Sequence, residues 1–269
     1  MSTQRQSFSW LFSSSPALGA TSITPDGSQF TALLPEAFQL PQNATNVTLE
    51  VNSATIWYNT FNVTEANNQF RFQRVFPAVV QTLFIPPGLY SFDALNNELT
   101  AQLTAAGITN YRLVANQPQQ RVYESFTSLP NGIVQTFWPE GTFYKLVGFN
   151  LNRNTVFPNA GPAAYPGDKT AAFNTIDYYL IHSSLVSRGI RTNGTFLQVI
   201  AQVPINAPPG SELLYEPQNP VVTPANELTG SVISQVTTLL TDSNNVPVDT
   251  RGEAYTVGVV IRWSVPVYQ

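Results

Sequence analysis

The sequence has no cysteine and only one histidine, His182, among its 269 residues. Without cysteine the chain forms no disulfide, which fits either a reducing compartment or a protein that does without thiols. A single imidazole with no thiol also excludes zinc sites of ordinary make-up and Cys/His nucleophile pairs. These absences remove the commonest metal-binding and nucleophilic arrangements.

Charge is also scarce, because Asp, Glu, Lys and Arg make up 10% of the chain, whereas about 25% is usual for soluble proteins. Lys145 and Lys169 are the only lysines and stand against ten arginines. Subunit interfaces favour Arg and aromatic residues over Lys, and a surface covered by neighbours needs less solvating charge. The composition therefore predicts a homo-oligomer. The net charge of -4 argues against direct binding to nucleic acid, which requires clustered basic residues.

Long hydrophobic runs are missing too. No run approaches the roughly 20 apolar residues of a membrane span, and the apolar patch at residues 10–12 is too short for a signal-peptide core. Residues 1–29 are Ser-rich and aperiodic up to a Pro-Asp-Gly turn, so they are predicted to form a flexible arm that is ordered mainly by a partner. Residues 30–269 are predicted to form the folded domain.

Strand-like patterns dominate the remainder of the chain. The clearest lies at the C-terminal end, where apolar residues alternate with other residues at a period of two, which indicates one buried face. These residues are Tyr255, Val257, Val259, Ile261, Trp263, Val265 and Val267. Many short strands separated by turn residues, with one or two short helices in the connections, predict an all-β sandwich of the jelly-roll type.

One segment is clearly helical. Ser91 follows a Pro-Pro-Gly turn and is a good N-cap, and Gly107 supplies the stop. Leu95, Leu99 and Leu103 recur at a spacing of four, so the helix is expected to lie on a sheet by its leucine stripe. A second, shorter helix is predicted around residues 142–147.

Candidate chemical sites are few. Glu212 and Glu216 would share one strand face as a glycosidase pair might, but their alternation with apolar residues favours a solvated face. Asp242, Asn244 and Asp249 could supply oxygens to calcium, although the loop lacks the glycine and glutamate of an EF-hand, which favours a plain turn. His182 is expected to be a strand histidine satisfied by its neighbours. No catalytic residue, cofactor or enzymatic activity is predicted.

The sequence leaves two alternatives for the number of jelly rolls. Pro-Pro-Gly occurs at residues 86–88 and again at 208–210, which would suit two tandem rolls. However, no leucine-striped helix follows the second copy, and the strand candidates are too few for sixteen strands. A single elaborated jelly roll is favoured, and the double roll remains the alternative.

The order of four motifs resembles the jelly-roll capsid proteins of tailless icosahedral double-stranded DNA viruses of the virophage and polinton-like type. The motifs are IPPGLYSFDALNNEL, FYKLVGFN, DYYLIHSSLVSRGI and LTDSNNVPVDTRGEAYTVGVVIRW. The resemblance is to penton or minor capsid proteins, and more loosely to double jelly-roll major capsid proteins, which form trimers. It implies a virion protein that is assembled inside the host cell. It also implies a pentamer at the vertex, neighbouring capsid proteins as partners, and an N-terminal arm that reaches an inner membrane or an adjacent capsomer.

The sequence is also compatible with a different class of function. Jelly rolls also serve as sugar- or receptor-binding modules, in which exposed aromatic rings stack on sugars. Trp57, Trp138 and Tyr165 are the candidates for such a platform.

Overall fold

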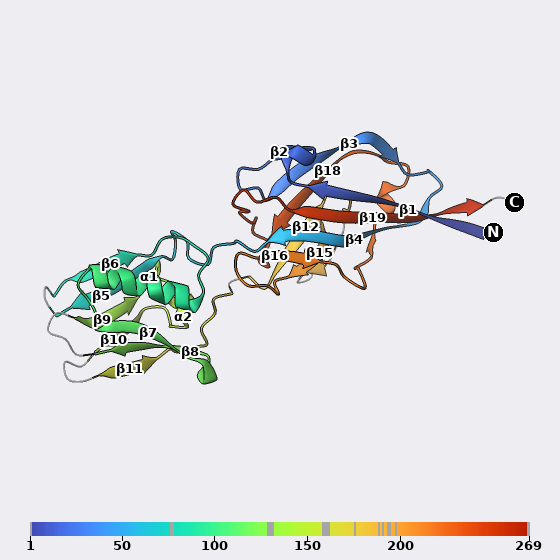
Figure 1. Cartoon of the computed structure of the whole chain (residues 1–269). Coiled ribbons are helices and arrows are strands. Elements are labelled where there is room, and N and C mark those ends of the chain that lie inside the picture. Colours follow the sequence, from blue (N-terminus) through green and yellow to red (C-terminus); the bar gives the residue numbers. More distant parts are fainter. Residues whose placement is uncertain are drawn as a thin grey trace. The chain divides into compact units, whose positions relative to one another are not determined.

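The structure is a computed structural model, and it divides into two compact units, residues 1–60 with 176–269 (unit 1) and residues 61–175 (unit 2) (Figure 1). The residues that it describes are 2–75, 78–127, 132–157, 162–174, 176–187, 189, 191–192, 195–196 and 198–267.

Unit 1 consists mainly of two antiparallel sheets. The first has the order β1 (Ser2–Ser13), β19 (Thr256–Val267), β4 (Thr45–Trp57) and β16 (Glu212–Tyr215), with β17 (Thr223–Pro224) also paired to β4. The second has the order β15 (Val199–Pro204), β12 (Tyr178–Ser183), β18 (Val232–Thr241), β3 (Gln29–Gln39) and β2 (Ala20–Ile23). Two short strands, β13 (Arg191–Thr192) and β14 (Thr195–Phe196), form a separate hairpin, and η1 (Pro16–Leu18) and η3 (Asn226–Leu228) are 3-10 turns.

The strand order of unit 1 is that of a jelly roll. If β1, β3, β4, β12, β15, β16, β18 and β19 are lettered B to I in chain order, the sheets read B-I-D-G and C-H-E-F. Eight strands in two such sheets form the jelly-roll sandwich, which confirms the predicted all-β fold. The described residues contain one set of these strands, so the single roll is confirmed and the double roll is wrong.

Aromatic side chains join the two sheets of the sandwich. Phe38 of β3 lies 4.8 Å from Phe8 and 5.1 Å from Trp10 of β1, and 5.8 Å from Trp263 of β19, measured between ring centroids. Phe30 of β3 contacts Tyr255, just before β19, at 5.3 Å. These contacts bury apolar area between the sheets, which stabilises the sandwich at roughly 25 cal/mol per Å².

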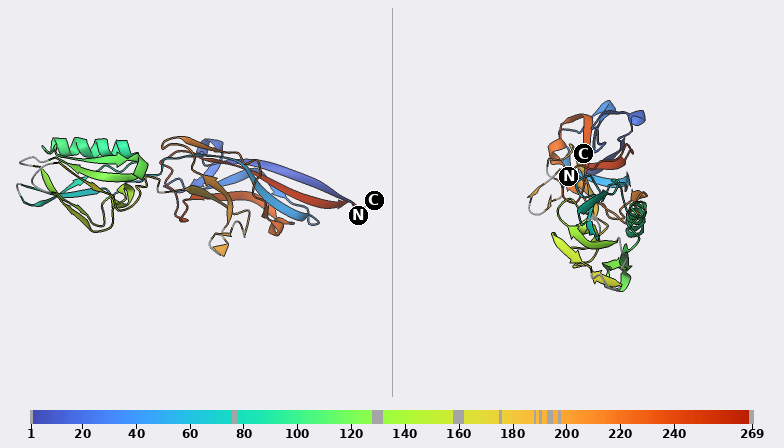
Figure 2. Two further views of the ribbon diagram at one scale, coloured as in Figure 1. Left: turned by 90° about the horizontal axis from the view of Figure 1, so that it is seen from below. Right: turned by 90° about the vertical axis from the view of Figure 1, so that its left-hand side faces the viewer.

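The prediction of a flexible arm over residues 1–29 is wrong. Residues 2–13 form β1, which pairs with β19 without interruption from Ser2↔Val267 to Ser13↔Thr256. Residues 20–23 form β2 against β3. The two long strands run side by side to the marked chain ends (Figure 2). The Ser- and Gln-rich sequence hid this strand, because residues 3–9 are all exposed and its partner strand lies at the other end of the chain.

The prediction of one domain over residues 30–269 also needs correction, because unit 2 is inserted between β4 and β12 of the jelly roll. The two junctions lie close together within unit 1, since the Thr60 hydroxyl is 2.7 Å from the hydroxyl of Tyr179 on β12. The chain therefore leaves the sandwich after β4 and returns to it next to the same place.

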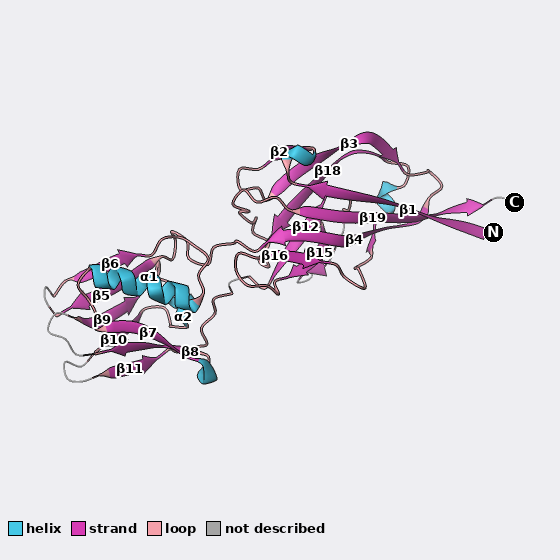
Figure 3. Cartoon of the chain, in the orientation of Figure 1, coloured by secondary structure: helices cyan, strands magenta, loops and turns pink. Residues whose placement is uncertain are grey.

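Unit 2 contains two smaller antiparallel sheets and the two α-helices (Figure 3). One sheet has the order β10 (Arg153–Val156), β9 (Ile133–Trp138), β5 (Gln69–Arg74) and β6 (Val80–Phe84). The other has the order β11 (Ala163–Pro166), β8 (Arg121–Phe126) and β7 (Tyr111–Asn116). The helices are α1 (Phe92–Ala105) and α2 (Tyr144–Val147), and η2 (Gln117–Gln119) is a 3-10 turn between β7 and β8.

Helix α1 forms as its sequence predicts. The Ser91 hydroxyl accepts a hydrogen bond from the Ala94 amide at 3.2 Å, and Leu95, Leu99 and Leu103 are buried in the core of unit 2. The helix also contacts one edge strand of each sheet. Its Asn96 side chain accepts from the amide of Leu113 on β7, and its Gln102 side chain donates to the carbonyl of Phe84 on β6. The helix therefore satisfies backbone groups at the β6 and β7 edges.

Candidate functional site

The calcium candidates use their oxygens within their own turns. Asp242 Oδ1 accepts from the amides of Asn244 and Val246, and Asp249 Oδ1 accepts from the amide of Arg251. Among the described residues no group of three or more His, Asp or Glu side chains is placed to hold a metal ion. The loop therefore contains the predicted turn, which the amide of Asn245 closes on the carbonyl of Asp242 at 2.9 Å.

The residues considered for catalysis do not come together in one site within the described part of the chain. His182 is half-buried on β12, with its Nε2 2.9 Å from the Thr241 hydroxyl, and burial lowers the pKa of its imidazole. Glu212 of β16 and Glu216, which follows the strand, are both exposed, and Leu214 between them is 64% exposed. Two carboxylates on an open sheet face enclose no substrate.

Of the three aromatic candidates for a sugar platform, the structure excludes one. Trp138 is fully buried in the core of unit 2, so its ring is not available to a ligand. Tyr165 is half-buried against Phe157, and Trp57 of unit 1 is 37% exposed. The burial of Trp138 was not evident from the sequence, because a period-two pattern shows which residues share a face but not which face is covered.

The edge strand β1 is the feature of unit 1 that best fits an interface. In sheet β1-β19-β4-β16 the far side of β1 pairs with no described strand, and residues 3–9 are all exposed. The strand has no bulge, proline or lysine, and Arg5 is its only charge. Proteins usually protect long edges with these devices, because unpaired backbone groups template pairing with another chain. Leu11, which is 68% exposed, adds apolar surface to the same strand.

A buried carboxylate is the main polar feature inside unit 2. Glu124 on β8 is 0% exposed, and its two oxygens accept from side chains of β7, β9 and β10, so the residue links both sheets. The partners are Tyr111 (3.1 Å), Thr136 (2.5 Å) and Trp138 (3.1 Å) on Oε1, and Thr155 (2.6 Å) and the Arg153 guanidinium (3.5 Å) on Oε2. Sequence reasoning missed this site, because a single Glu in a strand gives no sign that five donors surround it.

The partners of Glu124 keep the carboxylate paired. Burial, and after it the Glu124 carboxylate, raises the pKa of the Tyr111 phenol well above its usual value, so Tyr111 stays a donor. Arg153 also forms an ion pair with Asp168 at 3.1 Å and lies 4.5 Å from the centroid of the Phe149 ring. A saturated carboxylate without access to solvent is structural rather than catalytic.

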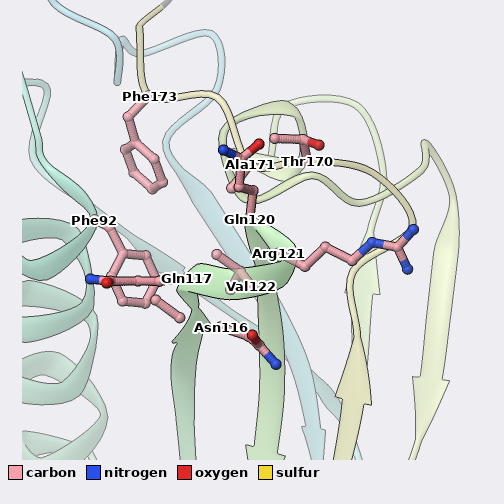
Figure 4. Close-up of a pocket in the computed structure, with 10 residues that line it drawn as sticks. Phe92, Asn116, Gln117, Gln120, Arg121, Val122, Thr170, Ala171 and Phe173 are labelled. Atoms are coloured by element: carbon pink, nitrogen blue, oxygen red, sulfur yellow. The ribbon is translucent and has the colours of Figure 1, made fainter.

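Three hollows surround the β7–β8 hairpin and the segment after β11. The first, of about 480 Å³, lies between Phe92 at the start of α1, the hairpin and residues 170–173 (Figure 4). The second, of about 540 Å³, lies on the other side of the hairpin and includes Arg112. The third, of about 570 Å³, includes Lys145 and Lys169. None of the three is lined by a carboxylate.

Within the part of the chain that the structure describes, no helix is both long and apolar enough to cross a membrane.

Comparisons with known proteins show a similarity at the level of solved structures. No protein-family model matches the chain, and no curated protein does. Among solved structures the chain is similar to the crystal structure of the selenomethionine-labelled mavirus penton protein, with 11% sequence identity and a TM-score of 0.46. The similarity covers 97% of this chain and 100% of that one. At this level of likeness a functional assignment has to be supported by the geometry of the chain itself.

Proposed function

We propose that this protein is a structural subunit of an icosahedral viral capsid, in which unit 1 forms the shell. The observation that carries the proposal is the B-I-D-G and C-H-E-F strand order of unit 1. Jelly rolls of this kind build viral capsids, although they also occur in lectins and cupins. A fold alone does not determine function. Features of the surface are therefore needed to favour a capsid subunit over a lectin or a cupin.

The surface supports assembly in two ways. Only 10% of the residues are charged, so side faces can be covered by neighbours at a modest desolvation cost. Apart from the charge of Arg5, the long edge of β1 has none of the usual protection against pairing with another chain. A module that works as a free monomer would be expected to protect such an edge.

The vertex position is the finer part of the proposal. A single roll with one exposed edge suits a ring in which unlike patches of neighbouring copies meet, and such a ring closes as a pentamer at a five-fold axis. The motif order described above also resembles penton and minor capsid proteins. The partners would be further copies of this chain and the neighbouring capsid subunits of the virion. The N-terminal arm that was expected to reach an inner membrane is not present, because residues 2–13 form a strand. We therefore do not include a membrane among the partners.

The test is the mass of the purified full chain by light scattering after size exclusion, with negative-stain images of the same fractions. A pentamer of the 29.5 kDa chain would have a mass of about 148 kDa and show five-fold rings. A trimer would overturn the vertex position but keep a role in the shell. A monomer that persists at high protein concentration and at all salt concentrations would contradict the capsid proposal.

A further inference from the structure

Charge is divided unequally between the two units. Unit 2 has seven Lys and Arg against six Asp and Glu, a net charge of +1, whereas unit 1 has five against ten, a net charge of -5. Both lysines of the chain are in unit 2. The acidic character of the protein therefore belongs to unit 1, and unit 2 can attract anions.

Four cations of unit 2 gather around the three hollows. Arg121 lines the first hollow, Arg112 the second, and Lys145 and Lys169 the third. Among the described residues none of the four has a carboxylate within ion-pair distance, whereas Arg153 has two. The hollows adjoin, because Asn116 and Gln117 line both the first and the second, and Thr170 lines both the first and the third.

The first hollow also offers amides and rings. The side chains of Gln117 and Gln120 have no hydrogen bond to a described residue, so their amides can bind a ligand. Phe92 and Phe173 are half-buried and meet edge to face at 6.0 Å. In Figure 4 these rings lie on one side of the hairpin tip, and Arg121 extends away on the other. A ligand here would meet apolar surface, neutral amides and then positive charge.

The backbone around these side chains is held in place. The Asn116 side chain accepts from the amide of Gln119, and the carbonyl of Gln120 accepts from the amide of Ala171. Gln120 has a φ of +51°, a left-handed conformation that is uncommon for residues other than glycine. Such a conformation costs free energy and persists where the surroundings enforce it. The hairpin tip therefore presents its side chains from a fixed position, which lowers the entropy cost of binding.

We propose that unit 2 binds an acidic oligosaccharide across these adjoining hollows. Hydroxyl groups of a sugar suit the glutamine amides, its apolar ring face suits Phe92 and Phe173, and its carboxylate or sulfate groups suit the unpaired cations. Nucleic acid fits less well, because the chain is acidic overall and unit 2 has a net charge of only +1, whereas binding to phosphates requires clustered basic residues. This inference does not depend on the capsid role, since a site in unit 2 would act in any assembly state.

The experiment is isothermal titration of the full chain with four probes at low salt. Heparin tetrasaccharide carries sulfates as well as carboxylates, 3′-sialyllactose carries a carboxylate alone, lactose is the neutral control for sialyllactose, and a short oligothymidylate represents nucleic acid. We expect binding to at least one acidic sugar and none to lactose. Binding to sialyllactose would show that a carboxylate is sufficient, whereas binding to heparin alone would indicate that sulfate is needed. Tighter binding to oligothymidylate than to either acidic sugar, or no binding to either, would overturn the proposal.

Variants then test the site. Lys145→Gln with Lys169→Gln should weaken binding about 2- to 30-fold, since each of the two exposed ion pairs contributes about 0.2–1 kcal/mol. Arg251→Gln with Arg262→Gln removes the same two positive charges from unit 1 and should leave binding unchanged. Gln117→Ala alters no charge and should also weaken binding, because its amide is expected to contact the sugar. Equal losses in the lysine variant and in the arginine variant, or no loss with Gln117→Ala, would reduce the effect to general attraction and contradict a built site.

Discussion

At the scale of single residues, Glu124 shows how one carboxylate can join two sheets. Taking a carboxylate out of water costs several kcal/mol, and this cost is offset only when the group is fully paired. Each oxygen of Glu124 has at least two partners, and the partners lie on strands of both sheets of unit 2. Glu124 therefore holds the two sheets of unit 2 in one relative position, in addition to stabilising the unit.

Replacing Glu124 with Gln should destabilise unit 2 by about 3 kcal/mol, because the amide nitrogen faces donors and Arg153 loses its buried counter-charge. Hydrogen exchange of β8 and β9 measures this loss within the full chain. Glu140→Gln makes the same change at an exposed position of unit 2 and should have little effect. If both variants exchange at the same rate, the network does not stabilise the unit.

His182 gives unit 1 a pH dependence of known sign. Burial lowers the pKa of its imidazole below the usual 6.5, so the unfolded chain takes up this proton at a higher pH than the folded chain does. Stability is therefore highest above pH 6.5 and falls as the pH drops through this range to the lower folded pKa. Because this histidine is the only one, its ring proton resonance in an NMR titration reports the folded pKa directly.

The matched variant is His182→Gln, which should flatten the stability of unit 1 between neutral pH and the folded pKa. Denaturant midpoints at several pH values, followed by a probe in unit 1, measure this slope. An unchanged slope in the variant would assign the pH dependence to other groups.

At the scale of elements, α1 could be predicted from the sequence and β1 could not. Helix signals are local, since Ser91, the leucine stripe and Gly107 all lie within one segment. Strand β1 is defined by its partner β19, which lies more than 240 positions away. The alternation of β19 was clear because its inner residues are apolar, whereas much of β1 consists of Ser and Gln with exposed side chains.

The candidate sites show the same difference between features set by local sequence and features set by long-range contacts. The turn at Asp242 was favoured from its own sequence, and the structure agrees with that preference. The Glu124 network and the hollows of unit 2 combine side chains from several separate strands and loops. No periodicity in the sequence marks such groupings.

The β1 edge leads to a prediction about assembly. Leu11→Lys places the natural protecting residue of edge strands on β1, and it should shift the oligomer toward smaller species in light scattering. Leu18→Lys is a matched control, because Leu18 in η1 is 69% exposed, almost the same as Leu11 at 68%, and is not part of the strand. If both variants assemble like the parent, or lose assembly equally, β1 is not the contact strand.

At the scale of the whole molecule, the insertion makes the chain separable into two parts. Unit 2 has its own apolar core, and the Thr60–Tyr179 contact keeps the two ends of the jelly-roll segments close together. Residues 61–175 alone, and residues 1–60 joined to 176–269 by a short Gly/Ser linker, should each fold. Dispersed amide NMR spectra and cooperative melting measure this for each part. A collapsed product from either part would mean that the two units fold only together.

The position of the insertion also sets the order of folding during synthesis. Unit 2 is continuous in sequence, so it can fold as soon as residue 175 has left the ribosome. The jelly roll cannot, because β19 pairs with both β1 and β4 and is made last. At roughly 5–20 residues per second, β1 waits about 10–50 s for this partner. During that interval the apolar side chains of β1 and β4 remain uncovered, which makes the nascent jelly roll, rather than unit 2, the part of the chain that needs chaperones.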